Sequence, residues 1–112
     1  MKSIGIIGLG RFGKVLASIL QKGYKVSAFD IENNSSLPGV EFCDIEKIIN
    51  EEVIFIAVPI RHFKSLIIDI APRLKSGTTI IDVCSVKSYP VKIMTNYLSA
   101  DIGIIATHPM FG

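Results

Sequence analysis

Three glycines near the N-terminus have a spacing that could hold a phosphate group. They occur as Gly8-x-Gly10-x-x-Gly13, between the apolar run 4–8 and a helical pattern. Gly8 would allow a tight turn, Gly10 would let a ligand approach the backbone, and Gly13 would let the helix pack closely on a sheet. The start of that helix would offer free N–H groups and the positive end of its dipole. The turn therefore predicts a site for a pyrophosphate.

A carboxylate follows at the place where a dinucleotide site requires one. Asp30 ends the next predicted strand, about twenty positions after Gly8. Such a carboxylate accepts both hydroxyls of the adenosine ribose of NAD and repels the 2′-phosphate of NADP. Arg11 would offset part of that repulsion, so NAD is the predicted cofactor and NADP the alternative. A plain glycine-rich turn beside a solvated carboxylate is the competing interpretation. The predicted cofactor-binding residues of this segment are Gly8, Leu9, Gly10, Arg11, Phe12, Gly13 and Asp30.

Two later segments carry polar side chains at the ends of predicted strands. They are 82–87, Asp-Val-Cys-Ser-Val-Lys, and 107–112, Thr-His-Pro-Met-Phe-Gly. Ligands of doubly wound sheets bind beyond the carboxyl ends of the strands, so both segments would lie on the rim of the glycine turn. Val58 and Pro59 end another predicted strand, where they would either contact the cofactor or simply stop the strand.

His108 is the candidate general base of this rim. Removal of a hydroxyl proton must accompany hydride loss from an alcohol, and imidazole titrates in a suitable range. Ser85 would hydrogen-bond the same hydroxyl or orient the histidine, and Lys87 would pair with a substrate carboxylate or cap a strand end. From spacing alone, a purely structural histidine before a proline competes with the catalytic role. His62 is expected to be exposed and to cap a helix.

Short apolar runs alternate with longer amphipathic stretches, and this alternation predicts βαβ units. The expected Rossmann-type fold is a doubly wound parallel sheet in three αβα layers, formed by one domain over residues 1–112. The expected strands are 4–8, 25–30, 53–58, 79–82 and 102–107, with a loop over 31–39. The expected helices are 12–20, 44–50 capped by Asp44, 63–74 kinked or ended by Pro72, and 90–98.

Composition excludes several classes of protein. Hydrophobic residues make up 49% of the chain and charged residues 20%, which excludes a disordered tail. The net charge of +2 comes from scattered lysines, so no nucleic-acid partner is expected. Cys43 and Cys84 have no metal-ligand spacing, so we expect reduced thiols and no metal. No apolar run approaches the ~18–20 residues of a membrane span. We therefore expect a soluble, cytoplasmic protein with no membrane partner.

The sequence resembles the N-terminal NAD(P)-binding domain of prephenate/arogenate dehydrogenases. The first two matching pieces, 6–13 (Ile-Ile-Gly-Leu-Gly-Arg-Phe-Gly) and 55–59 (Phe-Ile-Ala-Val-Pro), are shared by many β-hydroxyacid-type dehydrogenases. The next two, 82–87 and 108–112, are more specific in this order and placement. Together the four pieces cover essentially the whole chain.

The resemblance implies oxidative decarboxylation of prephenate or arogenate in tyrosine biosynthesis. Hydride would pass from the hydroxyl-bearing ring carbon to the nicotinamide, and loss of CO₂ would aromatise the ring. In the family, the histidine of the His-Pro motif engages the ring hydroxyl and the serine of the Ser-Val-Lys motif lies beside it. These roles carry over to His108 and Ser85, and Lys87 joins them as a substrate-binding residue.

One departure from the family is large. Its members continue into a helical C-terminal domain that forms the dimer and supplies groups for the substrate carboxylates, and this sequence stops at Gly112 without it. We therefore expect an isolated domain or fragment with little or no turnover alone, and a dimer only where that domain is present. The alternatives are a stand-alone nucleotide-binding or regulatory module and the cofactor domain of another β-hydroxyacid-type dehydrogenase.

Overall fold

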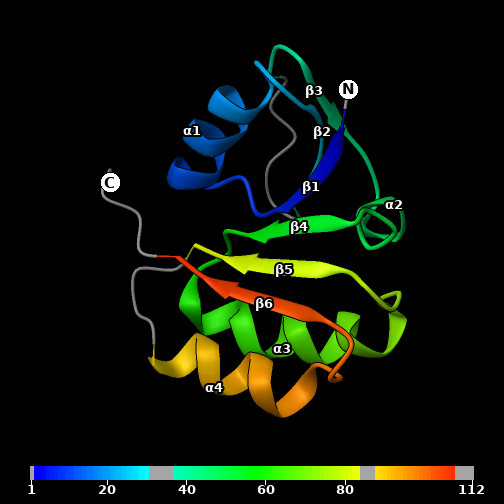
Figure 1. Cartoon of the computed structure of the whole chain (residues 1–112). Coiled ribbons are helices and arrows are strands. Elements are labelled where there is room, and N and C mark those ends of the chain that lie inside the picture. The colour runs from blue at the N-terminus through cyan, green and yellow to red at the C-terminus, as the bar shows by residue number, and fades with distance from the viewer. Residues whose placement is uncertain (1, 31–36, 84–87, 108–112) are drawn as a thin grey trace.

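The structure, a computed structural model, describes residues 2–30, 37–83 and 88–107 (Figure 1). Ser85, Lys87 and His108 lie outside these ranges, as does most of the predicted loop. The strands are β1 (Ser3–Ile7), β2 (Lys25–Phe29), β3 (Val40–Phe42), β4 (Val53–Ile56), β5 (Thr79–Asp82) and β6 (Gly103–Ala106). The helices are α1 (Arg11–Leu20), α2 (Ile45–Ile48), α3 (Ile60–Ile70), the short 3₁₀ helix η1 (Ala71–Arg73) and α4 (Ser88–Tyr97).

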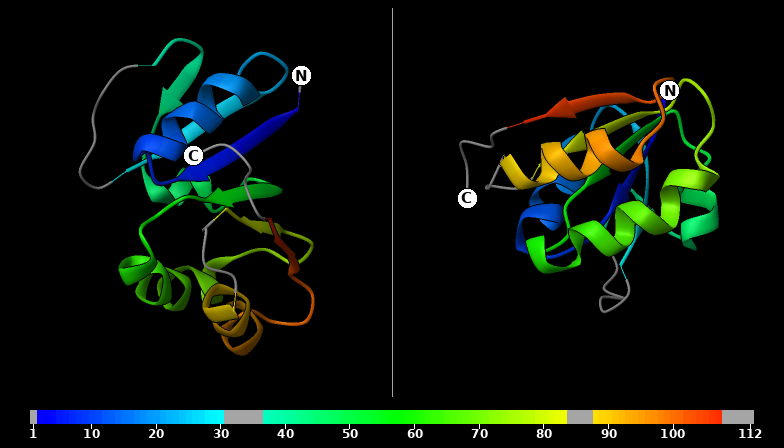
Figure 2. Two further views of the ribbon diagram at one scale, coloured as in Figure 1. Left: turned by 90° about the vertical axis from the view of Figure 1, so that its left-hand side faces the viewer. Right: turned by 90° about the horizontal axis from the view of Figure 1, so that it is seen from below.

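The described strands form one sheet in the order β3-β2-β1-β4-β5-β6, and every neighbouring pair is parallel. Strand order reverses between β1 and β4, so right-handed crossovers place α1 on one face and α3 and α4 on the other. Figure 2 shows these helices on opposite sides of the sheet. The predicted three-layer, doubly wound fold is confirmed. Its switch point between β1 and β4 is where such sheets bind ligands.

The unbroken apolar sequence of β4 explains why this strand lies in the middle of the sheet. Ile54 and Ile56 are fully buried in the core that α3 and α4 cover. Val53 and Phe55 point the other way and pack against the core under α1. A strand covered on both faces needs apolar residues at every position, and β4 meets that need. It is therefore one of the two central strands, β1 and β4, between which the switch point lies.

Prolines lie at the ends of helices, as the sequence predicts. Pro72 is the second residue of η1, which directly follows α3, because a proline ring prevents an α-helix from continuing. Pro90 lies in the first turn of α4, where its missing N–H has no helical partner to lose. The end of α3 before Pro72 is confirmed, whereas α4 begins at Ser88, two residues earlier than predicted.

The structure corrects three details of the predicted elements. The helical spacing of Phe12, Leu16, Ile19 and Leu20 predicts that Ile19 faces the core with the other three. Its side chain is instead 51% exposed, and Gly13 and Ala17 are buried. α2 ends at Ile48, two residues earlier than predicted, and Asp44 lies at its N-cap without a capping hydrogen bond from its side chain. The three-residue strand β3 was missed, because so short a run has too little alternation to detect.

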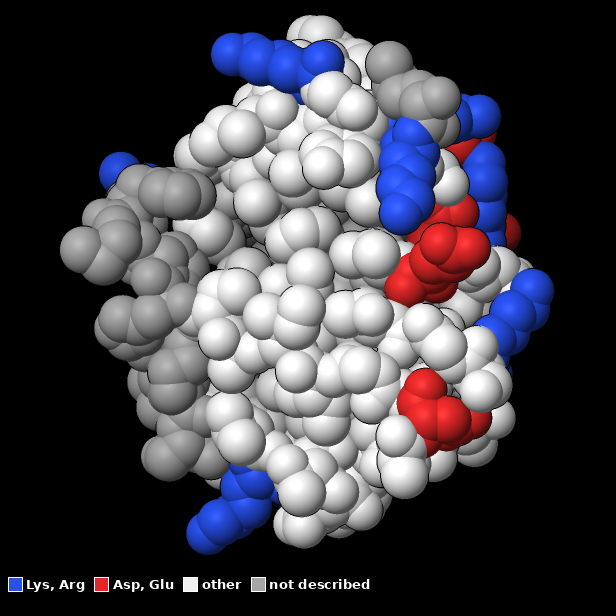
Figure 3. All heavy atoms as spheres, in the orientation of Figure 1, with Lys and Arg blue, Asp and Glu red and all other residues white. Residues whose placement is uncertain are grey.

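The face seen in Figure 3 has charged side chains mainly at its margins. Its middle, over β4, β5 and β6, is largely free of them. Ile104 and Ile105 of β6 are 37% and 48% exposed, so within the described residues both sides of this edge strand reach solvent. No helix of the described part of the chain is long and apolar enough to cross a membrane.

Candidate functional site

The turn after β1 requires glycine at its first position. Gly8 has a φ of 105°, a conformation that residues with a Cβ rarely adopt. A Cβ added there would lie 2.6 Å from the carbonyl oxygen of Ala57, which follows the neighbouring strand β4. Ala57 is fixed in turn by its N–H, which donates to the carbonyl of Ile7 at 2.8 Å. The backbone at the end of β4 therefore leaves no room for a side chain at position 8.

The other two glycines of the turn have contrasting surroundings. A Cβ on Gly13 would lie 2.2 Å from the carbonyl oxygen of Gly8, so α1 packs directly against the turn. A Cβ on Gly10 would meet no atom within 4 Å. Gly10 is also the N-cap of α1, whose first N–H groups have no helical partner. The packing role predicted for Gly13 is confirmed, and the open side of Gly10 fits the close approach of a phosphate.

Asp30 is tied to the glycine turn by a hydrogen bond. It directly follows β2, and one of its carboxylate oxygens accepts the backbone N–H of Leu9 at 2.5 Å. The N–H of Gly8 donates to the carbonyl of Phe29 at 2.8 Å, which holds the turn to the end of the same strand. The side chain of Leu9 is fully buried in the core under α1. The carboxylate is thus positioned beside the turn, as a ribose ligand must be.

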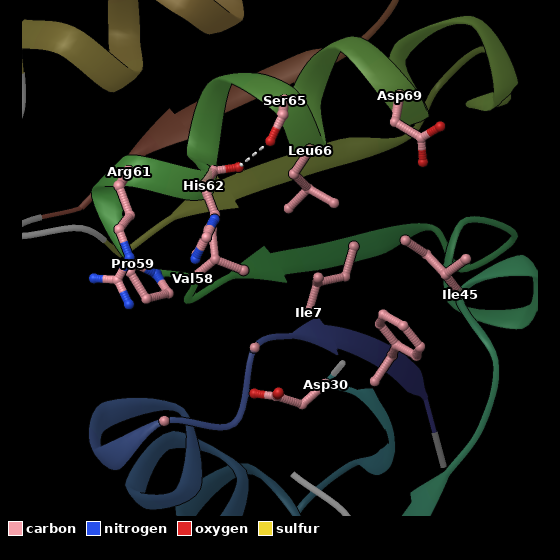
Figure 4. Close-up of a pocket in the computed structure, with 13 residues that line it drawn as sticks. Ile7, Asp30, Ile45, Val58, Pro59, Arg61, His62, Ser65, Leu66 and Asp69 are labelled. Carbon is pink, nitrogen blue, oxygen red and sulfur yellow. Dashed lines mark hydrogen bonds between the residues drawn. The ribbon is translucent and has the colours of Figure 1, made fainter. Parts of the chain in front are cut away.

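A cleft of about 550 Å³ opens at this place, between the glycine turn and α3 (Figure 4). Asp30 lies on one side of it, and Val58, Pro59 and α3 form the other. The residues that line the cleft are Ile7, Gly8, Gly10, Phe29, Asp30, Ile45, Val58, Pro59, Arg61, His62, Ser65, Leu66 and Asp69. The structure therefore brings Gly8, Gly10, Asp30, Val58 and Pro59 of the predicted site into one cleft. Arg11 and Phe12 begin α1 and are not among the lining residues.

The wall formed by α3 was not identified from the sequence. Phe63, Ile67 and Ile70 of this helix are fully buried in the core, as their spacing predicts. A second stripe, with the helical spacing i, i+1, i+4, i+5 and i+8, faces the cleft instead. Its residues are Arg61, His62, Ser65, Leu66 and Asp69. The polar face of an amphipathic helix normally faces water, and only the position of α3 at the switch point distinguishes this stripe from a solvated one.

His62 is exposed, as expected, but its side chain does not cap the helix. Its backbone N–H donates to the carbonyl of Pro59 at 2.9 Å, and its carbonyl accepts the Ser65 hydroxyl at 3.1 Å. Pro59 is the N-cap of α3, and no side chain makes the capping hydrogen bond there. Figure 4 shows the imidazole of His62 directed into the cleft near Val58. His62 is therefore a residue of the cleft, which the sequence analysis missed.

An ion-pair network closes the far end of the α3 wall. Both Asp69 and Glu46 pair with the Arg73 guanidinium at 2.7 Å, one from α3 and the other from α2. The network ties α2, which bears the cleft residue Ile45, to the end of α3. The carboxylate of Asp69 is thus already paired with a cation, although it lines the cleft.

A second part of the rim begins where β5 and β6 end. Asp82 pairs with Ala106 across the two strands, and the N–H and hydroxyl of Thr107 donate to the Asp82 carbonyl at 2.9 and 2.8 Å. The N–H of Val83 donates to Ile56 of β4, which ends beside the cleft. The segments that bear Ser85 and His108 thus leave the sheet from adjacent strand ends. Both residues lie outside the described ranges, so their positions remain predictions.

Comparison with known proteins decides the family of the chain. The family described as "Prephenate dehydrogenase, nucleotide-binding domain" matches residues 17–112. The chain belongs to this family. The match begins after the glycine turn, so it rests on the later strands and helices and is independent of the Gly-x-Gly-x-x-Gly pattern.

Curated relatives extend the similarity across the turn. A "Probable arogenate/prephenate dehydrogenase" of Methanocaldococcus jannaschii is 34% identical over an alignment 119 positions long, gaps included, which covers 98% of this chain and 27% of that protein. "Arogenate dehydrogenase 1, chloroplastic" of Arabidopsis thaliana is 34% identical over an alignment of 117 positions, which covers 97% of this chain and 18% of that protein. The chain therefore spans about a quarter of the first relative's length and less of the second's.

Solved structures of the same kind share the fold. Synechocystis arogenate dehydrogenase superposes with a TM-score of 0.84 at 25% identity, over 98% of this chain and 41% of that one. Prephenate dehydrogenase from Aquifex aeolicus, solved with hydroxyphenyl propionate and NAD⁺, has a TM-score of 0.84 at 23% identity. That match covers 100% of this chain and 43% of the other. At such identity the Aquifex aeolicus structure supports the fold alone.

Proposed function

We propose that the cleft binds NAD, and that the chain acts as the cofactor-binding domain of a prephenate or arogenate dehydrogenase. One observation carries the proposal. The Asp30 carboxylate is held by the Leu9 N–H at the edge of a turn whose Gly10 leaves an open approach to the start of α1. A carboxylate suited to a ribose and a turn suited to a phosphate thus lie side by side in one cleft at the switch point.

Each part of NAD has a suitable surface in this cleft. The open side of Gly10 and the first N–H groups of α1 suit the pyrophosphate. Asp30 suits the hydroxyls of the adenosine ribose. The apolar side chains of Ile7, Ile45 and Leu66 line the cleft beyond Asp30 and suit the adenine ring. The remaining half of the cofactor would then extend along Pro59 toward the ends of β5 and β6.

The charge of Asp30 favours NAD over NADP. The 2′-phosphate of NADP would lie against the Asp30 carboxylate, and the two negative groups would repel each other. The carboxylate would also lose the 2′-hydroxyl as a hydrogen-bond partner. A solved structure that shares the fold, prephenate dehydrogenase from Aquifex aeolicus, contains NAD⁺, which is consistent with this choice.

Residues beyond β5 and β6 would perform the chemistry on the substrate. Bound NAD would supply the hydride acceptor. His108 would take the proton of the ring hydroxyl, Ser85 would hydrogen-bond the same hydroxyl, and Lys87 would pair with a substrate carboxylate. The pairing of Asp82 with Ala106 supports this assignment, because it starts both segments from neighbouring points of the rim.

Kinetics of the natural polypeptide that carries this domain, at its full length, would test the assignment. Turnover of prephenate and of arogenate is measured with NAD for the unaltered enzyme and for His108→Asn. Loss of a general base lowers kcat by about 10²–10⁴-fold, while the Kd for NAD should stay the same. Lys87→Gln should raise KM, whereas Lys92→Gln, an equal change of charge on α4, should not. Unchanged turnover in His108→Asn would remove the catalytic assignment.

A further inference from the structure

The cleft has an uneven distribution of charge along its α3 wall. Arg61 lies beside Pro59 at one end, and Asp69 lies at the opposite end (Figure 4). Asp69 is paired with Arg73, and Asp30 accepts the N–H of Leu9. Arg61, by contrast, has no ion pair or hydrogen bond with its side chain among the residues that the structure describes. A guanidinium at the cleft thus has its donors available.

Arg61 lies at the same end of the cleft as the start of α1. In Figure 4 the turn between β1 and α1 emerges on the side where Arg61 and Pro59 lie. Neither α1 nor α3 has an acidic residue in its first turn, so no carboxylate of those turns competes for the guanidinium. An anion at the open side of Gly10 would therefore have the dipole of α1 on one side and a cation on the other.

The Arg61 guanidinium is the main source of positive charge in the lining of the cleft. Among the described lining residues, Arg61 is the sole lysine or arginine, and of the two acidic ones, Asp30 and Asp69, the second is already paired with Arg73. A dinucleotide brings two further negative charges on its pyrophosphate. A planar guanidinium can donate two parallel hydrogen bonds to one phosphate, which a lysine cannot do. The charge balance of the cleft thus favours a phosphate at Arg61.

We propose that Arg61 is a ligand of the cofactor's pyrophosphate, which it binds from the wall opposite the glycine turn. The inference rests on the proposed function, since it requires a dinucleotide in the cleft. It adds a side-chain ligand from α3 to the backbone cradle of the turn.

Calorimetric titration of the 112-residue chain with NAD⁺, NADP⁺ and adenosine tests the proposal. Arg61→Gln should weaken NAD⁺ and NADP⁺ equally, by about ten-fold, and leave adenosine unaffected, since adenosine has no phosphate. Arg61→Lys should recover part of the lost affinity. Lys64→Gln is the matched control, because Lys64 is an exposed cation of the same helix that does not line the cleft. It should bind all three ligands as the unaltered chain does.

The salt dependence of binding separates an electrostatic contact from a structural effect. The affinity of the unaltered chain for NAD⁺ should fall more steeply with salt than that of Arg61→Gln. Three results would overturn the proposal: unchanged affinity of Arg61→Gln for NAD⁺, an equal loss of affinity for adenosine, or a loss confined to NADP⁺, which would assign Arg61 to the 2′-phosphate. If the unaltered chain binds neither dinucleotide, the proposed function itself fails.

Discussion

Two alanine substitutions in the same turn should have opposite consequences, one for folding and the other for binding. In Gly13→Ala the new Cβ would lie 2.2 Å from the carbonyl oxygen of Gly8, a backbone atom that no side-chain rotation can move. In Gly10→Ala the new Cβ meets nothing within 4 Å, and its φ of −68° suits alanine. The first change should displace α1, and the second should fill the proposed phosphate site.

The size of each effect follows from these contacts. Overpacking costs about 1–3 kcal/mol, and the better helix propensity of alanine at position 13 recovers up to about 1 kcal/mol. We therefore expect Gly13→Ala to lower the free energy of unfolding by about 1–2 kcal/mol, or Tm by about 5–10 °C. Gly10→Ala should change that free energy by less than about 1 kcal/mol, because it alters only the N-cap. Its Kd for NAD should rise about ten-fold through steric overlap with the pyrophosphate.

Thermal unfolding followed by circular dichroism, and NAD titration of each folded variant, measure the two effects separately. A Gly13→Ala protein with the stability of the unaltered chain would show that the packing of α1 on Gly8 is not as close as described. A Gly10→Ala protein with unchanged NAD affinity would refute the phosphate site at the turn. The glycine spacing would then serve the fold alone.

Three further outcomes follow from the structure. Asp30→Asn should weaken the binding of NAD about ten-fold and raise the affinity for NADP relative to that for NAD. Titration with both cofactors measures this preference, and an unchanged preference would contradict the ribose role of Asp30. Arg73→Ala should lower the free energy of unfolding by less than about 1 kcal/mol in urea titrations, because the carboxylates of Asp69 and Glu46 are mostly exposed; a larger loss would mean that the network holds α2 in place. Burial raises the pKa of Cys43, so iodoacetamide should alkylate this thiol more slowly at pH 7 than a free thiol, with a rate that increases only at higher pH. Mass spectrometry measures the rate, and equal rates for the two thiols would refute that burial.

The sequence predicts the fold well wherever one local rule acts alone. The unbroken apolar run of β4 indicates a strand covered on both faces, and Pro72 marks the end of α3. The glycine turn is equally predictable from the sequence, because close backbone contacts require glycine at positions 8 and 13. Such features depend on few residues, close together in the chain.

The α3 wall of the cleft could not be read in the same way. His62 and Asp69 lie on the polar face of an amphipathic helix, which looks like any solvated face until the sheet order is known. The exposure of Ile19 is likewise decided by tertiary packing, since its spacing alone places it with the buried residues of α1. Periodicity therefore predicts that a helix forms, but it does not predict which other elements pack around that helix.

The most direct test of the central claim is a titration of the chain with NAD while its thermal unfolding is followed. Binding of one NAD per chain should raise the free energy of unfolding by about 2.7 kcal/mol at a hundred-fold excess over Kd. Tm should then rise by about 10 °C or more, and NADP should have a smaller effect at the same concentration. If neither cofactor shifts Tm, the cleft between the glycine turn and α3 is not a dinucleotide site.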